Sequence, residues 1–286
     1  NHQGNHRGSF MSRVMQFKAK VKNMALKYHV PAQAVLQNYM LERLLERVSL
    51  SKYHDRFILK GGMLIASMVG IGSRTTMDMD ATLKGFPLTE ERLQKAFLEI
   101  CSVSVNDEVE MVLDHIVPIR DDDEYGGFRV AVSARYESIN TPLKIDITTG
   151  DIITPKAVRY TFPSSFEDKR IDVWSYPIET ILAEKVETIL RRSVLNTRSR
   201  DFYDVYILIK TQSHILNKEI FHDALIATAE KRGSLFLLQN VENNLATIRT
   251  DSIVGSRWSS YCRDNFYAEG ISFNEVIELL TGILLK

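Results

Sequence analysis

The stretch that decides the fold is KGGMLIASMVGIGSRTTMDMD, residues 60–80. Two glycines stand directly before a run of small apolar residues, and a polar Ser-Arg-Thr-Thr segment then leads to two aspartates separated by one methionine. The apolar FIL before it is typical of a short buried strand. This order predicts a strand over 57–60, a tight turn, a short helix ending near Gly70, and a second strand in MDMDATL, residues 77–83.

The two aspartates form the first candidate site. Because residues two apart in a strand share a face, Asp78 and Asp80 point the same way, whereas Met77, Met79 and Ala81 point to the opposite side. Two carboxylates in a partly dry site repel each other unless a cation lies between them, and Mg²⁺ prefers carboxylate and phosphate oxygens. Taken alone, a D-x-D pattern is more often a solvated strand edge or a turn.

A third acid strengthens the metal interpretation. In LKIDITT, residues 143–149, apolar side chains alternate with Lys144, Asp146 and Thr148. Such a strand placed beside residues 77–83 brings Asp146 next to the pair and completes an oxygen-ligand set of the kind used in phosphoryl transfer. The alternative is an amphipathic strand with one solvated face.

The glycine pair suggests a phosphate site. Gly61 and Gly62 follow a strand directly, so backbone amides there can approach a phosphate that any Cβ would obstruct. The sequence is neither a Walker A motif nor G-x-G-x-x-G, which excludes the common nucleotide fingerprints. Glycine pairs also occur in plain turns, and Ser73, Arg74 and Thr76 also suit a polar loop. Their position immediately before the D-x-D favours a phosphate-facing role.

A second group of polar side chains lies on a predicted helix, IETILAEKVETILRR, residues 178–192. Lys185 and Arg192 share its polar face, where lysine offers a triphosphate a compact charge and arginine a forked partner. The next predicted helix carries Asp201 and Asp204 one turn apart. Local ion pairs and the preference for acids in a first helical turn explain much of this pattern without function.

The rest of the chain divides into a β-rich part and a helical part. Helical patterns cover residues 11–50, 88–103, 178–192, 200–210, 218–233 and 273–285, and strand patterns cover 109–119, 128–136 and 142–150. Residues 154–177 are interpreted as a hydrophilic loop that bridges the two parts. We therefore predict a mixed-sheet α+β fold, with a first domain over 11–165 and a mostly helical domain over 166–286. Residues 1–10 are interpreted as the remnant of an expression tag before a natural start near Met11.

Composition excludes several classes of protein. Lys plus Arg and Asp plus Glu number 36 each, so the chain has no overall field that favours nucleic acid or anionic membranes, and any polyanion site is a local patch. The two cysteines, Cys101 and Cys262, have neither disulfide-framework nor zinc spacing, which favours reduced thiols and the cytoplasm. No apolar run reaches the roughly 18 to 20 residues of a membrane span.

Taken in order, five segments resemble the AbiEii/AbiGii toxin family of nucleotidyltransferases, which are relatives of the DNA polymerase β superfamily from type IV toxin–antitoxin abortive-infection systems. The segments are FILKGGMLI, RTTMDMDATL, LKIDITTGD, ILAEKVETILRR and TRSRDFYDVYIL, and the resemblance covers roughly residues 35 to 210. It implies a nucleotidyltransferase-fold domain followed by a mostly helical domain, with an NTP bound in the cleft between them.

The resemblance also implies roles for single residues. Asp78, Asp80 and Asp146 correspond to ligands of Mg²⁺ (or Mn²⁺), and the third acid helps to activate the attacking hydroxyl. The implied catalytic residues are Asp78, Asp80, Asp146, Lys185 and Asp201, and the implied nucleotide-binding residues are Lys60, Gly61, Gly62, Ser73, Arg74, Thr76, Lys185, Arg192 and Asp204. Whether Asp201 or Asp204 is the functional acid stays open. One departure from the superfamily is that its glycine-serine pair at the helix start appears here as Gly61 followed by Gly62 and Met63, so any hydroxyl contact to phosphate must come from elsewhere.

The implied reaction is transfer of NMP from an NTP, with GTP and pyrimidine nucleotides both open, to RNA. The favoured acceptor is the tRNA 3′ end, growth arrest in phage defence is the outcome, and a cognate antitoxin is a partner. A local basic surface compatible with RNA comprises Lys156, Arg159, Arg191, Arg192, Arg198 and Arg200. The alternatives are the same fold acting on a small molecule or a protein, and a non-catalytic nucleotide-binding regulatory module.

Overall fold

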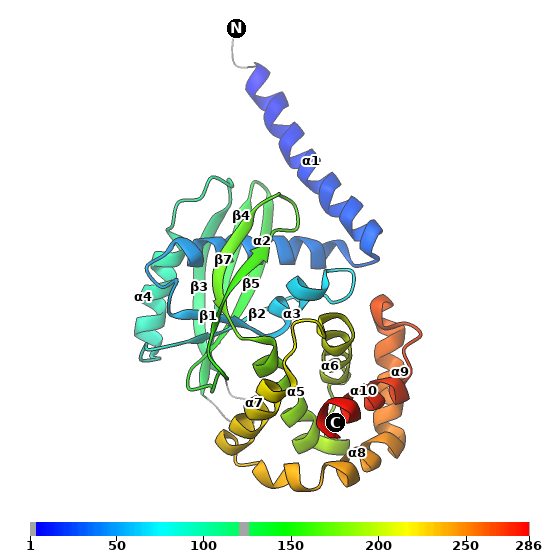
Figure 1. Cartoon of the computed structure of the whole chain (residues 1–286). Helices are drawn as coiled ribbons and strands as arrows, with labels where there is room; N and C mark the ends of the chain where they lie inside the picture. The colour runs from blue at the N-terminus through cyan, green and yellow to red at the C-terminus, as the bar shows by residue number, and fades with distance from the viewer. Residues whose placement is uncertain (1–3, 120–125, 286) are drawn as a thin grey trace.

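The computed structural model describes residues 4–119 and 126–285, and their side chains from residue 13 onward (Figure 1). Seven strands form one sheet in the order β3-β4-β5-β2-β1-β7-β6. The strands are β1 (Phe57–Lys60), β2 (Met79–Leu83), β3 (Glu110–Ile119), β4 (Gly127–Tyr136), β5 (Ile139–Thr148), β6 (Val158–Pro163) and β7 (Arg170–Ser175).

The helices flank the sheet and form most of the second half of the chain. They are α1 (Gly4–Tyr28), α2 (Ala32–Leu50), α3 (Gly61–Val69), α4 (Glu90–Cys101), α5 (Ile178–Arg192), α6 (Ser199–Gln212), α7 (Lys218–Lys231), α8 (Val241–Thr250), α9 (Ser252–Asp264) and α10 (Phe273–Leu285). In Figure 1, α2 runs across the sheet and α5 to α10 gather at one end of it, while α1 projects away. The predicted mixed-sheet α+β fold followed by helices is confirmed.

Strand directions make the sheet mixed. Strand β2 runs antiparallel to β1 and parallel to β5, while β7 runs parallel to β1. One face of the central strands is apolar: Leu59, Met79, Ala81, Val130 and Ile145 are each 0% exposed. Helices α2 and α4 contact the sheet through strands β3, β5 and β7. Because side chains alternate along a strand, the charged residues of β2 and β5 lie on the other face.

The interpretation of residues 154–177 as a loop is wrong, because this segment contains β6 and β7. Buried Phe162 on β6 and Ile171 and Val173 on β7 alternate with exposed neighbours, which is the period-two pattern of an edge hairpin. The predicted boundary after residue 165 falls inside this hairpin. The change from sheet to helix lies at Tyr176 and Pro177 instead, between β7 and α5.

The sheet and the helices share a continuous core. One cluster of buried apolar side chains includes Leu59 of β1, Leu182 of α5 and Ile277 of α10.

At the start of α4, the Thr89 hydroxyl accepts a hydrogen bond from the backbone N–H of Arg92 and caps the helix. None of the helices within the described ranges is long and apolar enough to cross a membrane.

Candidate active site

Four charged side chains form a row across the centre of the sheet. Lys60 on β1 is the register partner of Asp80 on β2, Asp80 is the partner of Asp146 on β5, and Asp146 is the partner of Arg129 on β4. Register partners in adjacent strands point to the same face. The predicted neighbourhood of β2 and β5 is confirmed, and two acids therefore lie side by side between two cations.

The acids carry negative charge that the protein only partly compensates. Burial raises the pKa of Asp80 above its ordinary value, and the nearby Asp146 raises it further, while Lys60 and Lys185 act in the opposite direction. Burial and Asp146 likewise raise the pKa of Asp78, which lies directly before β2. The three acids therefore act on one another, and a bound cation relieves their repulsion.

The donor set suits a hard divalent cation, since three carboxylates offer the oxygen ligands that Mg²⁺ prefers. Within the described residues, no three carboxylate, imidazole or thiol groups are gathered closely enough to hold a metal ion as they stand. Asp146 is engaged by Arg129 instead, whose Nε and Nη2 lie 2.8 and 3.0 Å from its two carboxylate oxygens.

The glycine turn packs against the acids. Gly61 has a φ of +72°, and a Cβ there would lie 2.3 Å from Oδ2 of Asp80. A Cβ on Gly62 would lie 3.1 Å from both Nη2 of Arg74 and Oγ1 of Thr76. The space that the glycines leave is thus bordered by an acid and an arginine. A hydroxyl is present there as well, although not from a serine at the helix start.

Arg74 is a buried residue whose guanidinium is paired with an acid. It is 3% exposed, and its Nε lies 2.7 Å from Oδ1 of Asp204 on α6. Lys185 on α5 lies 3.0 Å from Oδ2 of the same carboxylate. Although burial opposes the charge, Lys185 and Arg74 hold the pKa of Asp204 below its ordinary value. Asp204 thus fixes a loop residue and a helix residue beside the acids.

Asp201 holds Lys185 from the next helical turn. Its Oδ1 lies 3.1 Å from Nζ of Lys185, and its Oδ2 lies 3.5 Å from Nε of Arg198. Burial opposes the charge of Lys185, but Asp204 and Asp201 raise its pKa above the ordinary value. The choice between Asp201 and Asp204 was left open by the sequence, and in the structure both acids contact the lysine.

Comparison with known proteins identifies the family. A family model described as the nucleotidyl transferase AbiEii toxin of a type IV toxin–antitoxin system matches residues 43–278. The chain belongs to the AbiEii nucleotidyl transferase toxin family. It is therefore a transferase of nucleotidyl groups and a toxin of a type IV system. No curated protein sequence matches the chain.

Solved structures show a distant likeness. JHP933 from Helicobacter pylori is 16% identical, with a TM-score of 0.48 over 89% of this chain and 91% of that one. A second Helicobacter pylori structure is also 16% identical, with a TM-score of 0.47 over 89% and 94%. An antigenic nucleotidyltransferase-like protein from Paracoccidioides brasiliensis is 17% identical, with a TM-score of 0.38 over 68% and 91%.

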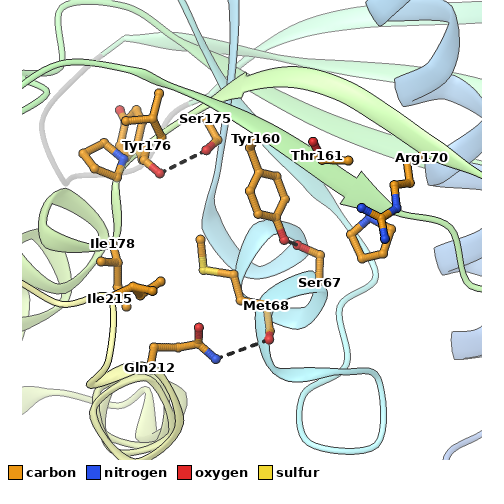
Figure 2. Close-up of a pocket in the computed structure, with 13 residues that line it drawn as sticks. Ser67, Met68, Tyr160, Thr161, Arg170, Ser175, Tyr176, Ile178, Gln212 and Ile215 are labelled. Atoms are coloured by element: carbon orange, nitrogen blue, oxygen red, sulfur yellow. Dashed lines mark hydrogen bonds between the residues drawn. The ribbon is translucent and has the colours of Figure 1, made fainter.

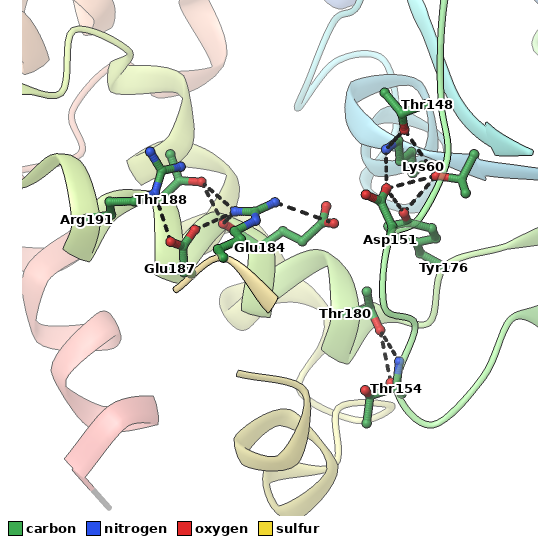
Figure 3. Close-up of polar contacts among 12 residues, drawn as sticks. Lys60, Thr148, Asp151, Thr154, Tyr176, Thr180, Glu184, Glu187, Thr188 and Arg191 are labelled. Carbon is green, nitrogen blue, oxygen red and sulfur yellow. Dashed lines mark hydrogen bonds and ion pairs between the residues drawn. The ribbon is translucent and has the colours of Figure 1, made fainter. Parts of the chain in front are cut away.

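In this AbiEii family chain, Lys60 belongs to a cluster that sequence reasoning missed (Figure 3). Its Nζ donates to Oγ1 of Thr148 at 2.7 Å and pairs with the carboxylate of Asp151. The same carboxylate accepts hydrogen bonds from the hydroxyls of Thr82, at 2.9 Å, and Tyr176. Asp151 is the last residue of the LKIDITTGD segment. Had the predicted pairing of this strand been continued by a few residues, it would have brought Asp151 to the neighbourhood of Lys60.

The other AbiEii site residues lie around this centre at different distances. The Ser73 carbonyl accepts a hydrogen bond from the Tyr203 hydroxyl, and Oγ1 of Thr76 donates to the carbonyl of Asp78 at 3.0 Å. Arg192 lies in the last turn of α5. Seven residues separate it from Lys185, which is about 10 Å along a helix axis, so the structure does not bring these two side chains together.

The predicted basic surface is divided. Arg159 lies on β6, at the opposite edge of the sheet from β3, and its guanidinium is 5.1 Å from the centre of the Trp174 ring. Arg191 pairs with Glu187 at 2.8 Å, as Figure 3 shows. Arg198 pairs with Asp201, and Arg200 acts on the pKa of Asp78. Of this predicted surface, Arg200 therefore acts on one of the three acids, whereas Arg159 lies on an edge strand of the sheet.

A cavity of about 530 Å³ lies elsewhere, between the β6–β7 hairpin and helices α3 and α6 (Figure 2). Tyr160 points across it and its hydroxyl lies 2.7 Å from Oγ of Ser67. Gln212 donates to the carbonyl of Met68 at its lower side. Among the described residues that line it, none is one of the three acids. The charged row, and not this cavity, is therefore the candidate site.

Proposed function

We propose that this AbiEii family chain transfers NMP from an NTP to RNA, at the 3′ end of tRNA, and so arrests growth in phage defence. The observation that supports the proposal is the row in which Asp80 and Asp146 lie side by side. Lys185 acts on the carboxylate of Asp80 in this row. Adjacent acids facing a lysine suit a reaction in which a triphosphate and a divalent cation meet.

The acids would hold Mg²⁺ or Mn²⁺. Asp78 and Asp80 offer their carboxylates directly, and Asp146 joins them when it leaves Arg129. The bound ion supplies neutralisation of phosphate charge and polarisation of the attacking hydroxyl. Asp146 orients that hydroxyl and accepts its proton. The hydroxyl oxygen bonds to the α-phosphorus while the bond to the bridging oxygen of the β-phosphate breaks, and pyrophosphate leaves.

Lys185 would contact the triphosphate. Asp201 and Asp204 hold its ammonium from two successive turns of α6, so the lysine is positioned before the nucleotide arrives. Such positioning lowers the barrier because no reorganisation is needed during the reaction. Arg74 acts through Asp204, and we propose that it is a positioning residue rather than a phosphate contact.

The glycine turn would accept the phosphates. Gly61 and Gly62 keep side chains away from the space beside Asp80, and Ser73 and Thr76 border the same turn. Lys60 adds positive charge on the β1 side of the acids. Arg192 lies further along α5 and would contact a more distant part of the nucleotide or the acceptor. GTP and pyrimidine nucleotides both suit this arrangement.

Membership of a type IV toxin–antitoxin family supports a cognate antitoxin as partner, and we place the reaction in the cytoplasm. Arg198 and Arg200 supply local positive charge beside the acids for the RNA backbone. Because binding to RNA through phosphates weakens with salt, affinity for tRNA is expected to fall steeply as the salt concentration rises.

The experiment is incubation of the full chain with tRNA, each NTP in turn and Mg²⁺, followed by mass spectrometry of the tRNA. We expect a mass increase of one or more nucleotides, at least about 10³-fold slower for Asp80→Asn or Lys185→Ala. Asp55→Asn and Lys210→Ala change exposed residues of the same types and are expected to behave as the unmodified chain.

Parallel reactions contain a panel of small-molecule antibiotics or a cell extract depleted of RNA. Labelling of those acceptors without labelling of tRNA would show that the acceptor is wrong while the transfer is right. Nucleotide binding without turnover on any acceptor, at unchanged toxicity of Asp80→Asn in cells, would show a non-catalytic module instead.

A further inference from the structure

The contact between Arg129 and Asp146 joins an exposed cation to the acid that the reaction needs. The guanidinium meets the carboxylate through two parallel hydrogen bonds of 2.8 and 3.0 Å. The Arg129 side chain is 44% exposed, whereas that of Asp146 is 22% exposed. An arginine that reaches in from solvent therefore covers both oxygens of the third acid.

A competing anion can reach this pair from solvent, because the Arg129 side chain is 44% exposed. The forked guanidinium fits a phosphate as well as it fits a carboxylate. A phosphate group that approaches Arg129 from solvent can thus compete with Asp146 for the same two donors.

The position of Arg129 indicates which phosphate it meets. In the sheet, β1 and the glycine turn lie on one side of β2, and β5 and β4 lie on the other. Lys60 lies on the glycine side, where the proposed triphosphate binds. Arg129 lies on the opposite side, and Lys144 shares its face of the sheet, since Lys144 is the register partner of Ala131. Arg200, at the start of α6, acts on Asp78 together with these two.

We propose that Arg129 is an acceptor-operated latch: it keeps Asp146 out of the metal site until the phosphate backbone of the acceptor RNA binds its guanidinium. The inference rests on the proposed function and adds a specificity-determining residue to it. Lys144 and Arg200 extend the cationic surface on which that backbone lies. All three acids are therefore available to the metal only in protein molecules that have bound an acceptor RNA.

The latch couples two binding events. Release of Arg129 leaves Asp146 uncompensated beside Asp78 and Asp80, so affinity for a divalent cation rises. Because coupling between two sites is reciprocal, freeing Arg129 from Asp146 must also raise affinity for RNA. Each direction can be measured without any chemical turnover.

The first measurement is Mn²⁺ binding by titration calorimetry, without NTP or RNA. Arg129→Lys keeps the charge but loses the two-point contact, and we expect it to bind Mn²⁺ about fivefold more tightly than the unmodified chain. Lys144→Arg is the control, because it likewise exchanges one cation for another on the same face of the sheet and leaves the contact between Arg129 and Asp146 in place, and we expect a change below about twofold. Equal affinities of Arg129→Lys and the unmodified chain would overturn the latch, and so would a larger effect of Lys144→Arg.

The second measurement is tRNA affinity in EDTA by filter binding. Asp146→Asn frees Arg129, and we expect about fivefold tighter binding, an increase that disappears when Arg129→Gln is added. Asp78→Asn removes the same charge nearby without releasing Arg129, and we expect a change below about twofold. Equal effects of Asp146→Asn and Asp78→Asn on tRNA affinity would show that loss of any nearby negative charge is sufficient. This result would overturn the latch.

The two levels of the proposal fail differently. Absence of Mn²⁺ binding in every variant would contradict the metal site of the proposed function, and the latch with it. Normal Mn²⁺ binding that Arg129→Lys does not change would leave the metal site intact and remove only the latch. Circular dichroism of each variant verifies that the substitutions leave the fold unchanged.

Discussion

At the scale of the residue, one carboxylate oxygen explains why position 61 is glycine. Gly61 has a left-handed φ of +72°, and a Cβ there would lie 2.3 Å from Oδ2 of Asp80. Conformation and space thus exclude other residues for two separate reasons. The sequence predicted that a phosphate approaches the backbone at this turn. In the structure, the atom that lies close to Gly61 is the Asp80 carboxylate oxygen of the protein itself.

Gly61→Ala is expected to destabilise the chain by about 3 kcal/mol, because left-handed strain adds to the displacement of Asp80. Gly270→Ala is the matched control: Gly270 has a φ of +80°, and no atom lies within 4 Å of the place that its Cβ would take, so that about 1 kcal/mol is expected. Urea unfolding measures both. Equal losses of unfolding free energy in the two variants would show that the Asp80 side chain moves aside at no energetic cost.

Asp80→Asn is expected to raise the melting temperature by about 2 °C at pH 7. Burial, and then Asp146, raise the pKa of Asp80, so its negative charge destabilises the folded state above that pKa. The increase should shrink as the pH falls, since Asp80 then takes up a proton. Scanning fluorimetry between pH 4 and about 8 measures this, with exposed Asp55→Asn as control. A lower melting temperature at neutral pH would contradict the assigned electrostatics.

At the scale of the element, the β6–β7 hairpin is fixed to α2 by one buried acid. Glu42 of α2 accepts hydrogen bonds from the backbone N–H of Ser165 at 3.1 Å and from the hydroxyl of Ser164 at 3.3 Å. Asn38, one turn earlier, donates to it at 3.1 Å. The hairpin turn is thus held by a helix from the other end of the domain, 123 residues away in the sequence.

Burial raises the pKa of Glu42 to about 7 from an ordinary value of 4.5, despite the hydrogen bonds from Ser165. Between these two values the folded chain keeps a proton that the unfolded chain releases, so stability falls as the pH rises. Relative to Glu42→Gln, the chain should lose about 2 to 3 kcal/mol of unfolding free energy across this range. Urea unfolding at a series of pH values measures the difference.

Glu91→Gln provides the control for that series, since Glu91 is exposed in the first turn of α4. Its pH dependence is expected to match that of the unmodified chain. A Glu42→Gln curve parallel to both would mean that the pKa of Glu42 is the same in the folded and the unfolded chain, which would contradict the effect assigned to burial.

At the scale of the whole molecule, the sheet and the helices are held together by charge as well as by apolar packing. Arg74, from the loop before β2, and Lys185 of α5 both pair with Asp204 of α6. These pairs lie over a core cluster that extends from α2 to α10. The division into domains at residue 165 stays a prediction, and the shared core opposes independent folding of the two parts.

Calorimetry is expected to show a single unfolding transition whose van't Hoff and calorimetric enthalpies agree. The continuous core makes separate unfolding of sheet and helices unfavourable, because either part alone would expose apolar surface that the other covers. Two resolved transitions would support two separate domains instead. Arg74→Met is expected to lower the single transition temperature without splitting it, since it leaves Asp204 with one cationic partner fewer.

Much of the fold could be predicted from the sequence because it depends on local periodicity. The strand at 57–60 and the helix at 178–192 are found where the residue pattern places them. The hairpin at 158–175 was missed, since its alternation is short and is interrupted by a polar turn. Exposed edge strands carry a weaker apolar signal than central ones.

The sequence by itself determined that Asp80 and Asp146 lie on polar strand faces, since side-chain alternation is a property of the extended backbone; Asp78 lies directly before β2 rather than in it. Only the tertiary structure decided that Lys60 and Arg129 end the same row, because register between strands distant in the sequence depends on packing of the whole sheet. It also decided that Arg74 is buried and paired with Asp204. Charges acquire their partners only when the chain is folded, and the partners decide what each charge can do.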